Sequence, residues 1–85
     1  MITRLEQTIP YMTSPNYKER FKAEYYQLAL RLEKLDKFLN SYRAGLLNFE
    51  PTCSIMELEE QSQAMRKYLA ILSSRAKQEN IIIDW

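Results

Sequence analysis

Residues 16–42 carry apolar side chains at the spacing of an amphipathic helix. The steps alternate between four and three, which brings one side chain per turn to the same face. We call this apolar face the seam; it is formed by Phe21, Tyr25, Leu28, Leu32, Leu35 and Leu39. Ser14 and Pro15 are typical of a helix start, and the single glycine, Gly45, is typical of a helix end. We therefore expect a long helix over residues 16–44.

A second seam with the same spacing follows residues 45–53, which we expect to form a loop. Its positions are occupied by Leu58, Met65, Leu69, Leu72 and Ala76, with the polar Ser62 in the remaining position. Ser54 and Glu57 form the S-x-x-E pattern of a helix start, so the second helix is expected over residues 54–79. Two seams joined by a short loop predict one all-α domain, an antiparallel two-helix hairpin.

Two apolar segments lie outside this hairpin. Residues 1–14 form an N-terminal arm, in which Pro10 leaves room for at most one short helical turn before it. Residues 80–85 end in IIIDW, a hydrophobic C-terminal tail whose β-branched and aromatic side chains disfavour a helix. We expect both segments to become ordered only by packing on the hairpin.

The long helix also carries a second apolar stripe, nearly opposite the seam. It consists of Ala23, Tyr26 and Leu30. A hairpin alone would leave this stripe in water, so we expect it to be the interface of a homo-oligomeric helical bundle. The alternative is that the arm or the tail covers the stripe within one chain, and both arrangements can hold in part.

Composition narrows the classes of function. Twelve Lys and Arg against 11 Asp and Glu leave a net charge of +1, without the basic excess that binding to duplex nucleic acid requires. No histidine and one cysteine, Cys53, predict no internal disulfide, no metal site and a reducing compartment. The apolar runs are too short for a membrane span, and no secretory pattern is present. We expect a soluble cytoplasmic protein without a cofactor.

The start of the long helix carries the strongest candidates for a binding site, Tyr17, Lys18 and Arg20. A tyrosine ring can stack on a base, a guanidinium can donate two hydrogen bonds to a phosphate, and the first helical turn has free backbone N–H groups. This trio suits a nucleotide. The simpler alternative is that Tyr17 packs the helix start onto the core while both cations stay solvated.

The second helix adds Arg66 and Lys67 as candidate ligand residues. If chains associate, these cations could line a groove between subunits together with Arg20 or Arg31. Otherwise they form part of a solvated charged face.

Groups for catalysis are scarce in this sequence. It has no histidine base and no glycine-rich phosphate loop, and the adjacent carboxylates Glu59 and Glu60 diverge by about 100° on a helix. We therefore expect a binding protein without catalytic residues, not an enzyme.

Two blocks of sequence resemble a known family. They are YKERFKAEYYQLALRLEKLDKFL and, after the LNFEPTC loop, LEEQSQAMRKYLAILSSR. They are similar to small phage-encoded helical-hairpin proteins first catalogued in crAss-like phages, and the similarity covers about residues 16–77. The distinctive parts are the Y-x-E-R start at Tyr17 and the E-Q-x-x-A-M-x-x-Y-L block at Glu60.

The resemblance implies a phage anti-defence role in the host bacterial cytoplasm. Similar hairpins assemble into homo-oligomeric sponges that sequester the cyclic nucleotide signals of the CBASS and Thoeris immune systems without cleaving them. In such sponges an early tyrosine stacks on a base and a basic side chain meets a phosphate, roles that Tyr17 and Lys18 or Arg20 would take here.

Two other functions stay open at the level of the sequence. A phage interaction protein would block a host protein through Tyr26, Leu30 and the IIIDW tail. A structural helper of the virion or of phage assembly would co-purify with particles.

Overall fold

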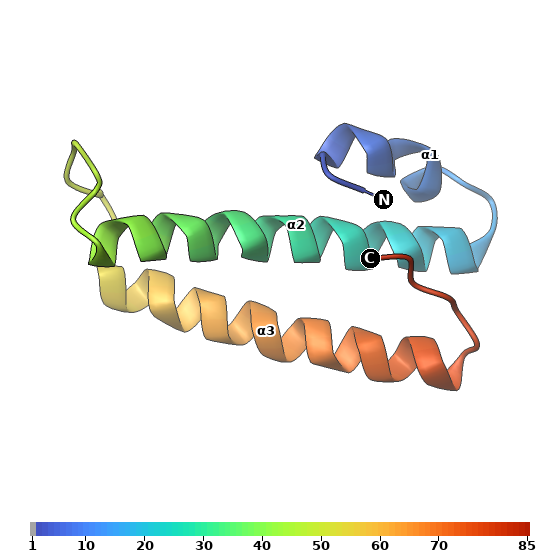
Figure 1. Ribbon diagram of the computed structural model, residues 1–85. Helices are drawn as coiled ribbons and strands as arrows, with labels where there is room; N and C mark the ends of the chain where they lie inside the picture. Colours follow the sequence, from blue (N-terminus) through green and yellow to red (C-terminus); the bar gives the residue numbers. More distant parts are fainter. Residues whose placement is uncertain (1) are drawn as a thin grey trace.

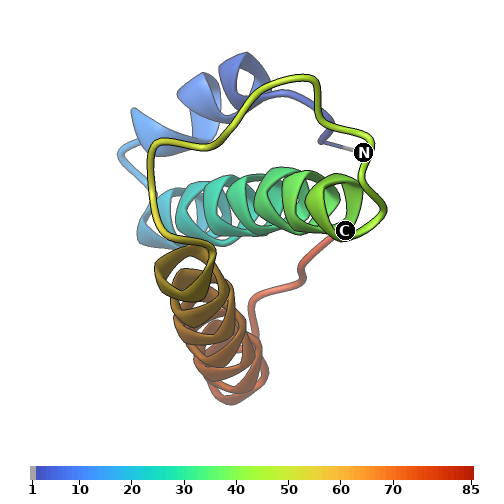
Figure 2. The same ribbon diagram turned by 90° about the vertical axis from the view of Figure 1, so that its left-hand side faces the viewer.

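The computed structural model describes residues 2–85, which form helices and connecting loops and contain no strand. In chain order the elements are the 3-10 helix η1 (Leu5–Thr8), α1 (Ile9–Met12), α2 (Tyr17–Arg43) and α3 (Ile55–Gln78). α2 and α3 lie side by side and run in opposite directions (Figure 1), while α1 and the C-terminal tail approach other sides of α2 (Figure 2). The all-α prediction is confirmed. None of these helices is long and apolar enough to cross a membrane.

Side-chain caps begin the two long helices. The Asn16 Oδ1 accepts a hydrogen bond from the Lys18 N–H at 2.9 Å, and the Ser54 Oγ accepts one from the Glu57 N–H at 3.3 Å. Each bond satisfies a backbone donor that has no partner inside its helix. Gly45, with φ +70°, follows α2 and supplies the left-handed conformation that turns the chain away.

The end of α3 turns the tail back along the molecule. Asn80 has φ +57°, and the N–H of the next residue, Ile81, bonds to the Ala76 carbonyl at 2.8 Å. This is the hydrogen-bond pattern of a Schellman motif. It directs Ile81 into the core instead of letting the helix continue.

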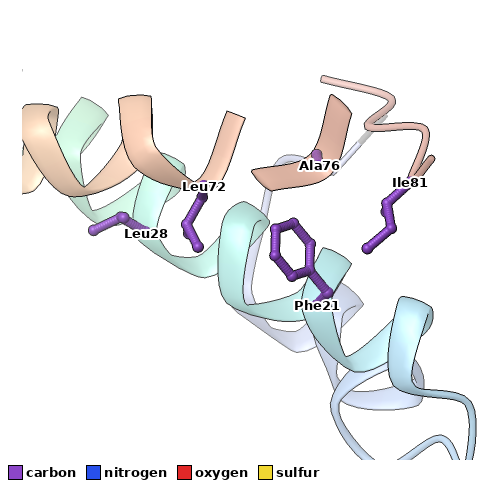
Figure 3. Packing of buried hydrophobic residues seen from close by; sticks show 5 residues of the cluster. All are labelled: Phe21, Leu28, Leu72, Ala76 and Ile81. Atoms are coloured by element: carbon purple, nitrogen blue, oxygen red, sulfur yellow. The ribbon is translucent and has the colours of Figure 1, made fainter. Parts of the chain in front are cut away.

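The core lies between α2, α3 and the tail. Figure 3 shows its central cluster: Phe21, Leu28, Leu72, Ala76 and Ile81. The Phe21 ring faces Ala76 and Ile81, and Leu72 has no exposed surface. Tyr25, Met65 and Leu69 of the predicted seams pack against this cluster. The four-three pattern therefore identifies the faces that the two long helices bury.

The N-terminal arm is more helical than the sequence indicates. η1 and α1 run through Pro10, where at most one turn before the proline was expected. Pro10 lies in the first turn of α1. A backbone N–H in the first turn has no acceptor within the helix, so the N–H that proline lacks costs no hydrogen bond. Thr8 anchors the arm: it is 1% exposed, and its Oγ1 donates to the Leu5 carbonyl at 2.7 Å and accepts from Gln27 Nε2 at 2.9 Å.

The second stripe of α2 is buried within the chain, which corrects the expectation that it is the interface between copies. Ala23, Tyr26 and Leu30 are 2%, 3% and 5% exposed. Tyr11 of the arm contacts the Tyr26 ring edge-on at 5.7 Å between centroids, and Trp85 of the tail stacks on it at 6.2 Å. The alternative, cover by arm and tail, describes this arrangement, because both segments adjoin α2.

Candidate functional site

The structure separates the five candidate ligand residues into three places. They are Tyr17, Lys18, Arg20, Arg66 and Lys67. Arg66 of α3 contacts Asp36, which lies 19 residues after Tyr17 on α2. At 1.5 Å per residue, this separation is about 28 Å along the helix. The five side chains therefore do not form one site within a single chain.

Tyr17 and Lys18 lie where α2 begins and α3 ends. The Tyr17 hydroxyl donates to Glu79 Oε1 at 2.8 Å and accepts from Arg75 Nη2 at 3.0 Å. The Lys18 ammonium donates to the Asn80 carbonyl at 3.4 Å. These bonds connect the start of α2 to the end of α3. The geometry therefore fits the simpler alternative, in which Tyr17 fastens the helix start. Its ring remains half-exposed and tilted against Phe21.

Arg66 belongs to a polar cluster between α2 and α3. Its Nη2 lies 2.8 Å from Asp36 Oδ2, and the Ser62 hydroxyl donates to Asp36 Oδ1 at 2.6 Å. The Ser62 hydrogen bond, together with Arg66, lowers the pKa of the Asp36 carboxyl below its ordinary value. Lys67, the next residue, is exposed, and its side chain makes no hydrogen bond or ion pair to any residue in 2–85.

This polar cluster borders a cavity of about 390 Å³. Its two guanidiniums are both matched by carboxylates, Arg66 by Asp36 at 2.8 Å and Arg43 by Glu59 at 3.7 Å. The positive charge is thus balanced inside the cavity. An anionic ligand would have to displace these carboxylates before it gained either guanidinium.

A second groove, between α1, α2 and α3, has a different charge pattern. We call it the arginine groove; it is lined by Met12, Arg20, Ala23, Glu24, Gln27, Leu28, Arg31 and Tyr68 and encloses about 330 Å³. The buried Ala23 and Leu28 form its apolar part. Its polar residues on α2 are spaced four, three and four positions apart, which places them along one side of the helix. They are Arg20, Glu24, Gln27 and Arg31.

Both guanidiniums of the arginine groove lack a carboxylate partner among residues 2–85. Arg20 Nη1 donates to the Ser14 carbonyl at 2.9 Å, and this bond leaves its charge unbalanced. The one carboxylate, Glu24, accepts a hydrogen bond from the Tyr68 hydroxyl, which raises the pKa of Tyr68. Two cations and one anion give the groove a net positive charge.

This arrangement suits an elongated anion with a flat group. Arg20 and Arg31 are 11 residues apart on α2, about 16 Å along its axis. Guanidiniums bind phosphate oxygens through paired N–H donors, and the half-exposed Tyr68 ring offers a surface for stacking. Phosphates near the two ends and an aromatic base between them would match these groups.

Of the five candidate ligand residues, only Arg20 lines this groove. The sequence predicts Arg31 only as a partner in an intersubunit groove, and it assigns no site role to Glu24, Gln27 or Tyr68. The four-three-four spacing of the polar residues on α2 is the signal that indicates Glu24 and Gln27, because it marks a polar stripe between two apolar ones. Tyr68 lies on α3, and only the tertiary structure brings it to this stripe.

Comparison with known proteins identifies one family. A family model described as Sequestin matches residues 15–78, which span most of the 85-residue chain and include all of α2 and α3. No curated protein matches the chain significantly, and neither does any solved structure. The matched range starts after the N-terminal arm and ends before the tail.

Proposed function

Because the chain belongs to the Sequestin family, we propose that it sequesters a small ligand and releases it unchanged. The family name denotes sequestration. The sequence resemblance to phage sponges supports a cyclic nucleotide immune signal as the ligand, either a CBASS cyclic oligonucleotide or a cyclic ADP-ribose of the Thoeris type. By lowering the free concentration of this signal in the host bacterial cytoplasm, the protein would act against phage defence.

The arginine groove is the observation that carries this proposal. It combines two guanidiniums without a carboxylate partner in the described chain, a stacking surface at Tyr68 and an apolar part. Charged hydrogen bonds of this kind contribute about 1.5–3 kcal/mol each. In the larger cavity beside Asp36 the guanidiniums are already paired, so the arginine groove is the better site for a phosphate ligand.

A sponge also needs no chemical groups beyond those that bind. Cys53, the one thiol of the chain, is exposed in the loop before α3 and does not line the arginine groove. The phenol of Tyr68 donates its hydrogen bond to Glu24, and this bond raises the pKa of Tyr68 above its ordinary value, so the side chain offers a bound hydroxyl and a stacking surface and not a base. We therefore propose binding without turnover.

Calorimetric titration tests the proposal directly. The purified full chain is titrated with cyclic dinucleotides, cyclic trinucleotides and cyclic ADP-ribose isomers, and the ligand is recovered after heat denaturation. We expect tight binding of at least one compound and its recovery intact. Binding followed by a cleaved product would contradict a sponge, and no binding across the panel, with capture of one host protein, would favour the interaction protein.

Variants locate the ligand on the molecule. Arg31→Ala and Arg20→Ala should each weaken binding at least tenfold, since about 1.4 kcal/mol corresponds to a factor of ten. Arg43→Ala is the matched control, because its guanidinium lies outside the groove and faces Glu59. If Tyr17→Ala abolished binding while Arg31→Ala did not, the ligand would lie at the hairpin end and not in the groove.

A further inference from the structure

The middle of the arginine groove offers a ligand hydrogen-bond acceptors and not donors. Glu24 and Gln27 lie there, between Arg20 and Arg31 along one side of α2. Glu24 Oε2 accepts a hydrogen bond from the Tyr68 hydroxyl, and Glu24 Oε1 accepts none from residues 2–85. An ionised carboxylate has acceptor sites only, so Glu24 can bind a ligand only through a donor of that ligand.

The orientation of the Gln27 amide is fixed by Thr8. The Thr8 hydroxyl donates its one hydrogen to the Leu5 carbonyl at 2.7 Å, so its oxygen can only accept from Gln27. The group that faces Thr8 must therefore be the amide NH2 of Gln27, whose Nε2 lies 2.9 Å from Thr8 Oγ1. The same Nε2 lies 3.6 Å from Met12 Sδ, which takes its second hydrogen. Both amide donors of Gln27 are thus used within the chain.

The carbonyl oxygen of Gln27 is left for a ligand. It accepts no hydrogen bond from residues 2–85, and no buried side-chain oxygen among these residues lacks a partner. The Gln27 oxygen is therefore not buried, and its side chain lines the groove. Glu24 and Gln27 are three residues apart, about 5–6 Å between their Cβ atoms. The middle of the groove consequently carries two neighbouring acceptors.

Guanine is the nucleobase whose edge matches two neighbouring acceptors. Its base-pairing edge carries two adjacent donors, N1–H and the N2 amino group. Adenine and cytosine offer one amino group beside a ring nitrogen that accepts, and uracil offers one N–H between two carbonyls. Against Glu24 and Gln27 these three bases would bring acceptor to acceptor, which is repulsive and leaves polar groups unpaired.

We propose that the arginine groove selects a guanine base, with Glu24 as the residue that determines this specificity and Gln27 as the second acceptor. The inference rests on the proposed function, which places phosphates at Arg20 and Arg31. A phenol donates near the plane of its ring, so the bond from Tyr68 holds the Glu24 carboxylate at the edge of the surface on which the base stacks. A cyclic oligonucleotide that contains guanine is therefore favoured over a cyclic ADP-ribose, whose base is adenine.

Calorimetric titration of the full chain with four cyclic dinucleotides tests the inference, because these compounds share one backbone and differ only in the base. They are cyclic di-GMP, cyclic di-IMP, cyclic di-AMP and cyclic di-UMP. Inosine lacks only the N2 amino group of guanine, so cyclic di-IMP should bind about tenfold more weakly than cyclic di-GMP. Cyclic di-AMP and cyclic di-UMP lose both matched contacts and should bind about a hundredfold more weakly.

The outcomes separate this inference from the proposed function. Equal or tighter binding of cyclic di-AMP would overturn the selection of guanine but leave the sponge in place. Absence of binding to all four compounds would also overturn it, and the cyclic trinucleotides and cyclic ADP-ribose isomers would then decide the proposed function on their own.

Glu24→Gln tests the role of the carboxylate. The variant keeps the size of the side chain but replaces one acceptor by an amide NH2, so the ratio of the affinities for cyclic di-GMP and cyclic di-AMP should fall at least tenfold. Glu33→Gln is the matched control: it makes the same chemical change at an exposed residue of α2 outside the groove, and the ratio should stay unchanged. An equal loss for both ligands in Glu24→Gln would show that Glu24 only supports the groove and does not recognise the base.

Discussion

Ser62 explains how a polar residue can occupy the apolar seam of α3. It is 5% exposed, and its hydroxyl donates to Asp36 and accepts from Arg66 at 3.1 Å. No buried side-chain nitrogen or oxygen lacks a hydrogen-bond partner among residues 2–85. The hydroxyl therefore links the two helices at a position where an apolar residue would only fill space.

Ser62→Ala should lower stability in a pH-dependent way. The pKa of Asp36 is lower in the folded chain than its ordinary value of 3.8, so its ionised form contributes stability above that pH, and this contribution is lost as the pH falls through the folded pKa. We expect the variant to lose about 1–2 kcal/mol of unfolding free energy near pH 7 and less near pH 2. Urea unfolding at both pH values measures the difference.

The exposed ion pair Lys37–Glu33 gives a control for this experiment. Its atoms are 3.1 Å apart on one helix, and Lys37→Ala should change the unfolding free energy by about 0.5 kcal/mol or less. An equal loss for Ser62→Ala at both pH values would show that the serine acts by packing and not through the carboxylate.

At the scale of elements, the two long helices end in the same conformation with different residues. Gly45 and Asn80 both have positive φ, at +70° and +57°. Glycine is recognisable in the sequence as a helix end, whereas asparagine occurs in many settings and gives a weaker signal. The turn at Asn80 matters more for the fold, because it directs Ile81 and the tail onto the core.

Substitution of Asn80 should separate the effect of its backbone conformation from that of its side chain. Asn80→Gly should be neutral or slightly stabilising, and Asn80→Val should cost about 1–2 kcal/mol because a β-branched residue strongly disfavours positive φ. Thermal unfolding followed by circular dichroism gives both values. Gln78→Val, at the exposed last residue of α3, is the control, and a similar loss in this variant would mean that helix propensity and not φ is responsible.

At the scale of the whole molecule, α2 is central because three segments cover it. α3 packs on the seam, and the arm and the tail meet over the second stripe, where Tyr11 and Trp85 both contact Tyr26. The Asp84 N–H also donates to the Tyr26 hydroxyl at 3.2 Å. Burial raises the pKa of this tyrosine, as expected for a phenol in an apolar site. The ends of the chain are thus part of the core.

Removal of residues 84–85 should expose the second stripe. We expect a lower melting temperature, stronger binding of a hydrophobic dye, and self-association through Tyr26 and Leu30, which are buried in the full chain. Ile82→Ser is the control, because Ile82 is 78% exposed and contributes little to packing. Unchanged stability after the deletion would mean that the tail does not contribute to the core in solution.

Much of the fold follows from local patterns in the sequence. The four-three spacing identifies the buried faces of α2 and α3, because helical periodicity is set by the backbone and does not depend on distant segments. Caps such as Asn16 and Ser54 are likewise local, since each bonds to an N–H two or three residues away. The sequence also shows that the second stripe is apolar, but it leaves open whether the arm, the tail or a second copy covers it.

The tertiary structure decided which surfaces are free. Whether Tyr26 faces a second chain or the tail depends on where Trp85 lies, and no local pattern specifies that position. Local sequence also does not specify which charges are paired. Packing places Asp36 beside Arg66, whereas Arg31 has no carboxylate partner in the described chain. Local sequence determines helices and their faces, while long-range contacts determine which faces and charges remain available to a ligand.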